Sequence, residues 1–116
     1  MNLYEKIQEA KSYIESRTQY RPTVGVILGS GLGQFVNEIQ NPVIFPYKDI
    51  PHFHTTSVQR HVGRLFIGRL EGKTVMMLQG RLHYYEGLSL ETVTIPVRVM
   101  KAFGVNSVII TNASGA

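Results

Sequence analysis

The sequence contains no cysteine, which excludes disulfide bonds, a thiolate nucleophile and a cysteine-ligated zinc site. It also has no apolar run that approaches the roughly 20 residues that a helix needs to cross a bilayer. Residues 1–16 form a charged amphipathic segment and lack the apolar core of a signal peptide. From these absences we expect a cytoplasmic protein that does not bind a membrane.

Acidic residues are missing from one long stretch of the chain. No Asp or Glu lies between Asp49 and Glu71, and the formal net charge of the protein is +4. The stretch is basic, with the residues Arg60, Arg64, Arg69, His52, His54 and His61. A nucleic-acid surface usually adds a basic helix or an aromatic platform, and the sequence has neither. We therefore expect this stretch to suit a small anion such as phosphate, and we expect no nucleic-acid partner.

The length and composition predict a single domain with one core, because 43% of the 116 residues are hydrophobic. Apolar residues recur at helical spacing in three segments, 1–17, 32–39 and 90–103. Pro96 lies inside the third segment, so that helix either kinks there or begins there. Gly104 then provides its stop.

Short apolar runs between these segments predict the strands of an α/β fold. The runs at 23–28 and 107–111 are continuously apolar, which is typical of parallel strands buried on both faces. The runs at 64–70 and 73–78 flank Glu71-Gly72 and should form an antiparallel hairpin. A short strand is expected at 43–45, ending at Pro46, and a long loop at 51–63. The sequence therefore predicts a mixed, mostly parallel sheet flanked by helices.

Three of these strands end in polar or glycine-rich turns, at 29–33, 79–87 and 112–116. Ligands of open α/β sheets bind at the carboxyl ends of the strands, so the turns form one site if the strands are parallel and close. The turn at 29–33 fits either an anion cradle at a helix start or a plain tight turn. Asp49 follows Gly29 by 20 residues, which leaves a dinucleotide site open as an alternative.

The stretch QGRLHYYEG carries the most specific chemistry. If the strand continues past Leu78, its period of two places Arg81, His83 and Tyr85 on one face. Arginine and histidine donate hydrogen bonds to phosphate oxygens, and tyrosine offers a ring with a polar tip to a sugar. Glu86 is placed to orient the histidine. The alternative is a surface Arg-Glu pair beside core tyrosines.

Three histidines in the basic stretch, His52, His54 and His61, raise the alternative of a metal site. Nearby carboxylates are sparse and cysteine is absent, so the usual ligand set is incomplete. We favour a solvated or anion-facing loop and expect no metal.

Five motifs together resemble a known family: GVILGSGLG, HVGRLFIG, QGRLHYYEG, TIPVRVMKAFG and TNASGA. They occur in the order and approximate spacing of the purine nucleoside phosphorylases of the trimeric type. These enzymes are more than twice as long, so residues 1–116 resemble a single partial domain, the amino-terminal part of the nucleoside phosphorylase fold. The resemblance implies pentosyl transfer: reversible phosphorolysis of purine (deoxy)ribonucleosides to free base and (deoxy)ribose 1-phosphate. It further implies a homotrimer when full length, with phosphate as a substrate and no cofactor.

The same resemblance implies a role for individual residues. The catalytic pair would be His83 and Glu86, and Tyr85, Ala113, Ser114 and Gly115 would face the nucleoside. Phosphate would be bound by Ser30, His61, Arg81, His83 and the backbone N–H of Ala113. Ser114 and Ala116 depart from the family's common TNAAGG, and Arg60 replaces a residue that is often small. Because the purine-recognising residues of the family lie beyond the matched portion, we expect the chain alone to lack efficient catalysis. The alternative is a non-catalytic phosphate- or nucleotide-binding α/β module.

Overall fold

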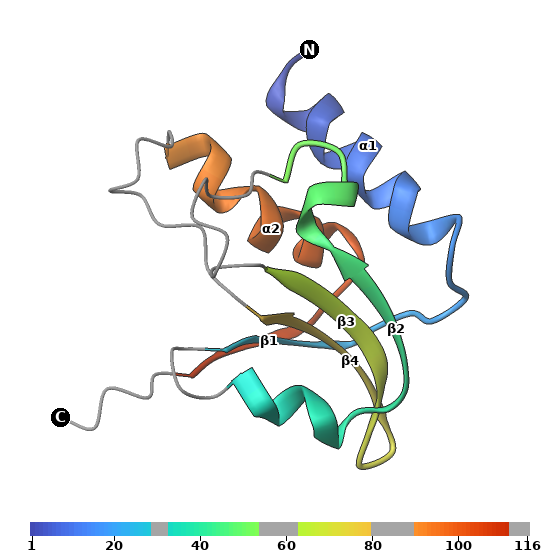
Figure 1. Ribbon diagram of the computed structural model, residues 1–116. Coiled ribbons are helices and arrows are strands. Elements are labelled where there is room, and N and C mark those ends of the chain that lie inside the picture. Colours follow the sequence, from blue (N-terminus) through green and yellow to red (C-terminus); the bar gives the residue numbers. More distant parts are fainter. Residues whose placement is uncertain (29–32, 54–62, 80–89, 112–116) are drawn as a thin grey trace, which may run out of the picture.

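A mixed sheet of five strands organises the chain, in the order β2-β3-β4-β1-β5 (Figure 1). The structure, a computed structural model, describes residues 1–28, 33–53, 63–79 and 90–111. The strands are β1 (Val24–Leu28), β2 (Gln40–Pro46), β3 (Arg64–Leu70), β4 (Lys73–Gln79) and β5 (Ser107–Ile110). β4, β1 and β5 are parallel to one another, and β3 is antiparallel to both of its neighbours. The expected mixed α/β sheet is thereby confirmed.

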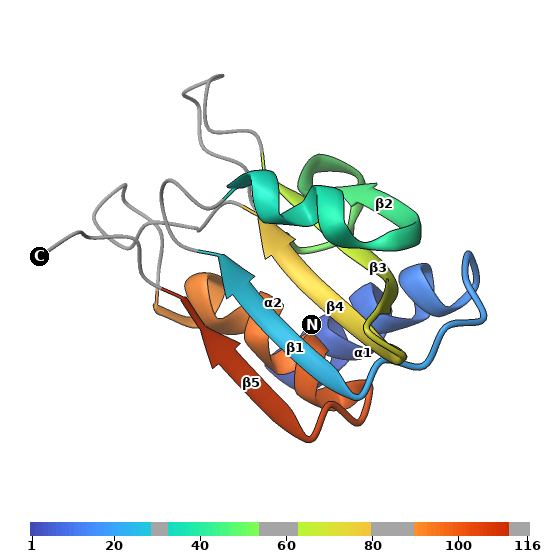
Figure 2. The same cartoon turned by 90° about the horizontal axis from the view of Figure 1, so that it is seen from below.

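Two α-helices cover one face of the sheet and a short 3-10 helix lies on the other (Figures 1 and 2). α1 (Leu3–Glu15) and α2 (Leu90–Ala102) pack against each other on the first face. η1 (Gly33–Glu38) lies on the opposite face, and η2 (Tyr47–Asp49) follows β2. Among the described residues, neither α-helix is long and apolar enough to cross a membrane.

The core is split by the sheet into two clusters of buried side chains. The larger cluster joins the sheet to the α-helices and includes Ile14, Leu65, Met76, Val99 and Met100, all fully buried. The smaller cluster lies between the sheet and η1. The two α-helices therefore provide most of the burial on one face, whereas η1 is the described helix that packs on the other.

The predicted hairpin is present, with β3 and β4 joined by a two-residue turn. Glu71 has φ 50° and Gly72 has φ 81°. Positive φ at both central residues is typical of the type I′ turn, whose twist matches that of the flanking strands. This turn pairs Leu70 with Lys73 and fixes the register along the whole hairpin.

α2 begins at Leu90 and continues through Pro96, so the alternative that the helix begins at Pro96 is wrong. Gly104 has φ 90° and follows the helix closely, as expected for a glycine that ends a helix. The chain then enters β5, which completes a crossover from β4 through α2 to a strand parallel with it.

Three predictions from the sequence differ from the structure. The segment after the glycine-rich turn is the 3-10 helix η1, and only one residue separates it from β2, which leaves room for a short helix. β2 is longer than expected and ends at Pro46. β5 was expected to be buried, but Ile109 is 51% and Ile110 is 65% exposed. β5 is exposed because it is the edge strand, which an apolar run by itself does not reveal.

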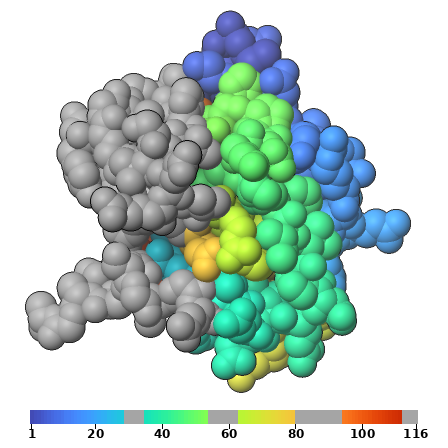
Figure 3. Space-filling view, in the orientation of Figure 1, coloured from blue at the N-terminus to red at the C-terminus, as the bar shows by residue number. Residues whose placement is uncertain are grey.

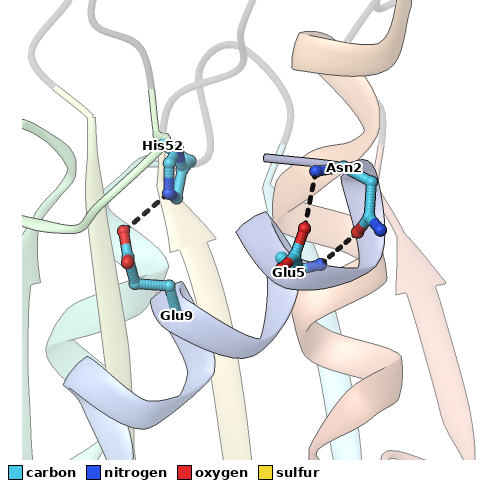
Figure 4. A network of polar contacts seen from close by, with 4 residues as sticks. All are labelled: Asn2, Glu5, Glu9 and His52. Atoms are coloured by element: carbon cyan, nitrogen blue, oxygen red, sulfur yellow. Dashed lines mark hydrogen bonds and ion pairs between the residues drawn. The ribbon is translucent and has the colours of Figure 1, made fainter.

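A capping box starts α1 (Figure 4). Asn2 Oδ1 accepts a hydrogen bond from the Glu5 N–H at 2.8 Å, and Glu5 Oε1 accepts one from the Asn2 N–H at 3.0 Å. Asn2→Ala removes the first of these bonds, so we expect the free energy of unfolding to fall by about 1 kcal/mol. Urea denaturation measures this change. Asn2→Ser retains a capping oxygen, and an equal loss in this control would contradict the capping explanation.

Candidate active site at the carboxyl ends of the parallel strands

The carboxyl ends of three parallel strands lie side by side (Figure 2). They form one edge of the sheet, which differs from the lateral edges formed by the outer strands β2 and β5. β1 is central, with Leu28 paired with Gln79 of β4 and Ile27 paired with Ile110 of β5. The three strands therefore end at nearly the same level. This confirms the condition on which the sequence-based site depended, namely that the strands are parallel and adjacent.

Every candidate residue lies outside the described residues, in segments that begin or end at this edge. Residues 29–32 follow β1, residues 80–89 follow β4 and residues 112–116 come after Thr111. Residues 54–62 lead through Gly63 into β3, which starts at the same edge because Arg64 pairs with Gln79. The candidates in these segments are Ser30, His61, Arg81, His83, Tyr85, Glu86, Ala113, Ser114 and Gly115. The points at which these segments join the sheet lie close together, whereas the positions of the candidate side chains stay predictions.

Arg64 is a described cation at this edge that the sequence analysis did not assign to the site. Its Nε donates a hydrogen bond to Gln79 Oε1 at 2.9 Å, and its Cζ lies 5.1 Å from the centroid of the Phe66 ring. In the space-filling view the start of β3 and the end of β4 reach the surface together (Figure 3). The signal was available in the sequence, because counting back from the two-residue turn pairs residue 64 with residue 79. A fixed positive charge therefore lies where the QGRLHYYEG stretch begins.

Thr111 keeps the end of β5 attached to β1. Its N–H and its hydroxyl both donate to the Ile27 carbonyl oxygen, at 2.9 and 3.1 Å. The TNASGA segment therefore leaves the sheet from a position fixed one residue beyond β5.

His52 is tied to α1 (Figure 4). Its Nε2 lies 2.7 Å from Glu9 Oε1, and its side chain is 25% exposed. The described residues contain no group of three His, Cys, Asp or Glu side chains that could hold a metal ion. His54 and His61, the other members of the metal alternative, lie outside the described residues.

The dinucleotide alternative is not supported by the position of Asp49. This residue lies in η2, directly after β2. β3 and β4 separate β2 from β1, which carries the glycine-rich turn. A ribose-binding carboxylate of a dinucleotide site belongs to the same compact β-α-β unit as the glycines.

Tyr47 contacts both residues that flank the segment 54–62. Its ring packs edge-on against Phe53 at a centroid distance of 5.4 Å, and its backbone N–H donates to the Gly63 carbonyl oxygen at 3.0 Å. A Cβ on Gly63 would clash with the Tyr47 ring, so only glycine fits there. Phe53 was assigned to a loop from the sequence, yet it is buried in the main core. The sequence signal for this burial was the spacing of three residues between the apolar side chains of Ile50 and Phe53.

Burial raises the pKa of the Tyr47 phenol above its ordinary value of 10.0. Because the pKa is raised only in the folded protein, the phenol loses its proton at a lower pH in the unfolded chain than in the folded one. The contribution of the neutral Tyr47 to the free energy of unfolding is therefore fully present below about pH 10 and decreases as the pH rises further. We expect the free energy of unfolding to fall more steeply above about pH 10 in the original protein than in Tyr47→Phe. Urea denaturation at a series of pH values measures the difference. The exposed Tyr4 provides the control, Tyr4→Phe, whose curve should follow the original. Parallel curves for the original protein and Tyr47→Phe would contradict the expectation.

Comparison with known proteins identifies the family. A family profile described as "Phosphorylase superfamily" matches residues 23–116. The chain is 50% identical over 111 residues to purine nucleoside phosphorylase 1 of Bacillus subtilis, covering 96% of this chain and 41% of the relative. It is 46% identical over 112 residues to the purine nucleoside phosphorylase of Rattus norvegicus, covering 97% of this chain and 39% of the relative.

Solved structures agree with these relatives. Isoform 2 of the purine nucleoside phosphorylase of Schistosoma mansoni, in complex with cytosine and ribose-1-phosphate, matches with a TM-score of 0.88 and 43% identity. A Schistosoma mansoni purine nucleoside phosphorylase in complex with inosine matches with a TM-score of 0.85 and 39% identity. Both matches cover 94% of this chain and 38% of the solved chain. The chain thus spans about two fifths of the length of these proteins, and the resemblance drawn from its motifs is confirmed: it belongs to the phosphorylase superfamily.

Proposed function

We propose that the chain is the phosphate-binding part of a purine nucleoside phosphorylase, and that the whole enzyme converts purine (deoxy)ribonucleosides and inorganic phosphate to free base and (deoxy)ribose 1-phosphate. The observation that carries this proposal is the register of the three parallel strands. It brings the segments after Leu28, Gln79 and Thr111 to one edge of the sheet.

The phosphate ligands come from all the segments that meet at this edge. Arg81 and His83 donate to phosphate oxygens from the segment after β4, and Ser30 donates from the glycine-rich turn after β1. The N–H of Ala113 and the side chain of His61 complete the set. Several donors on one dianion position it and neutralise its charge, because charge-assisted hydrogen bonds are about twice as strong as neutral ones.

The phosphate acts as the nucleophile at C1′ of the ribosyl group. A phosphate oxygen forms the new bond to C1′ while the C1′–N bond breaks, and the electron pair of that bond leaves with the purine. The purine takes up one proton to become the free base, which balances the proton that the attacking hydrogen phosphate gives up. Positive charge develops on the sugar in the transition state, so a fixed anion beneath C1′ stabilises it. Glu86 orients His83 so that the imidazole holds the phosphate in place. The reaction requires no cofactor.

The nucleoside lies over the phosphate, against Tyr85 and the segment Ala113, Ser114 and Gly115. Solved relatives in complex with inosine, hypoxanthine and ribose-1-phosphate support this substrate class. We also propose that the full-length protein is a homotrimer in the cytoplasm, as the resemblance implies.

The same convergence of strand ends also suits a second candidate, a non-catalytic phosphate- or nucleotide-binding module. This candidate shares the phosphate site and differs in turnover.

A measurement on the chain tests the phosphate site that both candidates share, and a measurement on a chimera separates the two candidates. Millimolar phosphate should raise the melting temperature, because a ligand that binds only the folded state stabilises it. Release of hypoxanthine from inosine, followed by chromatography, should depend on phosphate in a chimera that joins the chain to the rest of the Bacillus subtilis relative. Phosphate binding by the chimera without hypoxanthine release would favour the module. Absence of phosphate binding in both proteins would contradict both candidates.

A further inference from the structure

Arg64 lies in a row of paired residues that crosses the ends of three strands. It pairs with Gln79 at the end of β4, and Gln79 pairs with Leu28 at the end of β1. Adjacent strands are about 4.8 Å apart, so the Cα atom of Arg64 lies within about 10 Å of the points where the chain leaves β4 and β1. The segments that carry Arg81 and Ser30 begin at those two points. Arg64 is therefore next to the candidate site without belonging to either segment.

Two contacts hold the Arg64 side chain on the face of the sheet that carries η1. Its Nε donates to Gln79 Oε1 at 2.9 Å, and its Cζ lies 5.1 Å from the centroid of the buried Phe66 ring. An aromatic ring attracts a guanidinium at this distance. The bond from Nε uses one of the five N–H donors of arginine, and no described residue accepts a hydrogen bond from Nη1 or Nη2. The guanidinium is therefore fixed in place while most of its donors stay available.

The positive charge of Arg64 is not cancelled by any carboxylate that the structure describes. Among the described residues Arg64 forms no ion pair, and the sequence has no Asp or Glu between Asp49 and Glu71. Opposite charges directly across two strands stabilise a sheet, yet the residue across from Arg64 is the neutral Gln79. An amide oxygen holds the guanidinium as a carboxylate would, but leaves its charge uncompensated.

An uncompensated charge at this place would act on an anion bound at the strand ends. We propose that Arg64 strengthens phosphate binding there through its charge, and that Gln79 is a positioning residue that holds the guanidinium without cancelling that charge. The inference rests on the proposed function, because it requires phosphate to bind where the segments after β1 and β4 begin. Contact with phosphate is not required, since charges still interact over about one Debye length, about 10 Å at 0.1 M salt.

Isothermal titration of the chain with inorganic phosphate at low ionic strength measures this effect. Arg64→Gln removes the charge and should weaken binding about threefold to tenfold, because the attraction acts through solvent-screened space. Arg64→Lys keeps the charge and should bind phosphate within about twofold of the original protein. The loss in Arg64→Gln should become smaller at about 0.5 M salt, because salt screens the attraction.

Gln79→Glu separates the charge from the structural contact. The carboxylate retains an acceptor for Arg64 Nε but cancels the positive charge, so phosphate binding should weaken about threefold to tenfold. The free energy of unfolding, measured by urea denaturation, should not fall, because the hydrogen bond is kept and becomes an ion pair. A purely structural role of the pair predicts instead that Gln79→Glu binds phosphate as the original protein does.

The matched controls lie at the opposite end of the hairpin, beside its turn (Figure 2). Arg69 pairs with Thr74 across β3 and β4, and its Nη1 donates to Thr74 Oγ1 at 3.1 Å. Arg69 follows Arg64 by five residues, about 17 Å along the strand, which is longer than the Debye length. Arg69→Gln and Thr74→Glu make the same changes of charge at this distant place, so both should leave phosphate binding unchanged.

Three results would overturn the inference while the original chain binds phosphate, and they would leave the proposed function intact. The first is unchanged phosphate binding in Arg64→Gln or Gln79→Glu. The second is an equal loss in the controls Arg69→Gln and Thr74→Glu. The third is a loss in Arg64→Gln that does not depend on salt and that Arg64→Lys shares, which would assign Arg64 a purely structural role. Absence of phosphate binding by the original chain would contradict the proposed function, and the inference with it.

Discussion

Gly68→Ala is expected to be the most destabilising single change among the described glycines. A Cβ at this position would clash with Ile39 Cγ2 and lie 2.8 Å from the Gln40 carbonyl oxygen and 3.1 Å from Pro42 Cα. Two of these three atoms belong to the backbone of β2, so relief of the clash requires that strand to move away from β3. We expect the free energy of unfolding to fall by about 3 kcal/mol, as measured by urea denaturation.

Gly25→Ala is the matched control for this prediction. A Cβ on Gly25 of β1 would meet the Met100 side chain, whose Cγ would lie 2.9 Å away. The methionine chain is flexible and can adjust, so we expect a loss of only about 1 kcal/mol. A loss from Gly68→Ala no larger than that from Gly25→Ala would show that β2 does not lie as close to β3 as the structure indicates.

Arg81→Ala should have the largest effect on phosphate binding. If Arg81 donates to phosphate oxygens, its removal should cost about 1.5–3 kcal/mol, which corresponds to roughly 10- to 100-fold weaker binding. Nucleoside binding should change much less, because the proposed contact of Arg81 is with the anion. Isothermal titration with phosphate, and separately with inosine, measures the two effects.

Arg98→Ala is the matched control, because it removes an arginine side chain from a different part of the protein. Arg98 lies exposed on α2, where its Nε donates to Thr94 Oγ1 at 3.2 Å. This variant should bind phosphate as the original protein does. Equal weakening in both variants would mean that general positive charge attracts the anion, and would remove Arg81 from the site.

The sequence predicted the arrangement of the hairpin because the turn itself specifies it. A two-residue turn at Glu71 and Gly72 fixes the pairing of β3 with β4 without any information from the rest of the fold. The continuous apolar run of β1 likewise indicated burial on both faces, and β1 is indeed interior.

Other features depend on contacts that the local sequence does not carry. The run of β5 resembles that of β1, yet β5 is an edge strand, because strand order is set by the whole sheet. Phe53 lies in a polar stretch, where only its spacing from Ile50 indicated that it is buried in the main core beside Tyr47. The contact of His52 with Glu9 joins segments 43 residues apart in the sequence. Such pairings are decided by tertiary packing.

The candidate site was predicted at the level of strand ends. Sequence alone placed three chemically suitable segments after three strands, and the register of β4, β1 and β5 brings their starting points together. Arg64 was missed although the hairpin register pairs it with Gln79, because the register alone does not show that the two side chains form a hydrogen bond.

Phosphate titration followed by nuclear magnetic resonance tests the central claim most directly, that the three strand ends surround one phosphate. Backbone amide signals of residues 28–33, 79–87 and 111–115 should all shift as inorganic phosphate is added. The shifts in the three segments should give the same dissociation constant, whereas an equal concentration of chloride should leave the signals unchanged. Shifts confined to one segment, or different dissociation constants for the three, would contradict a single shared site.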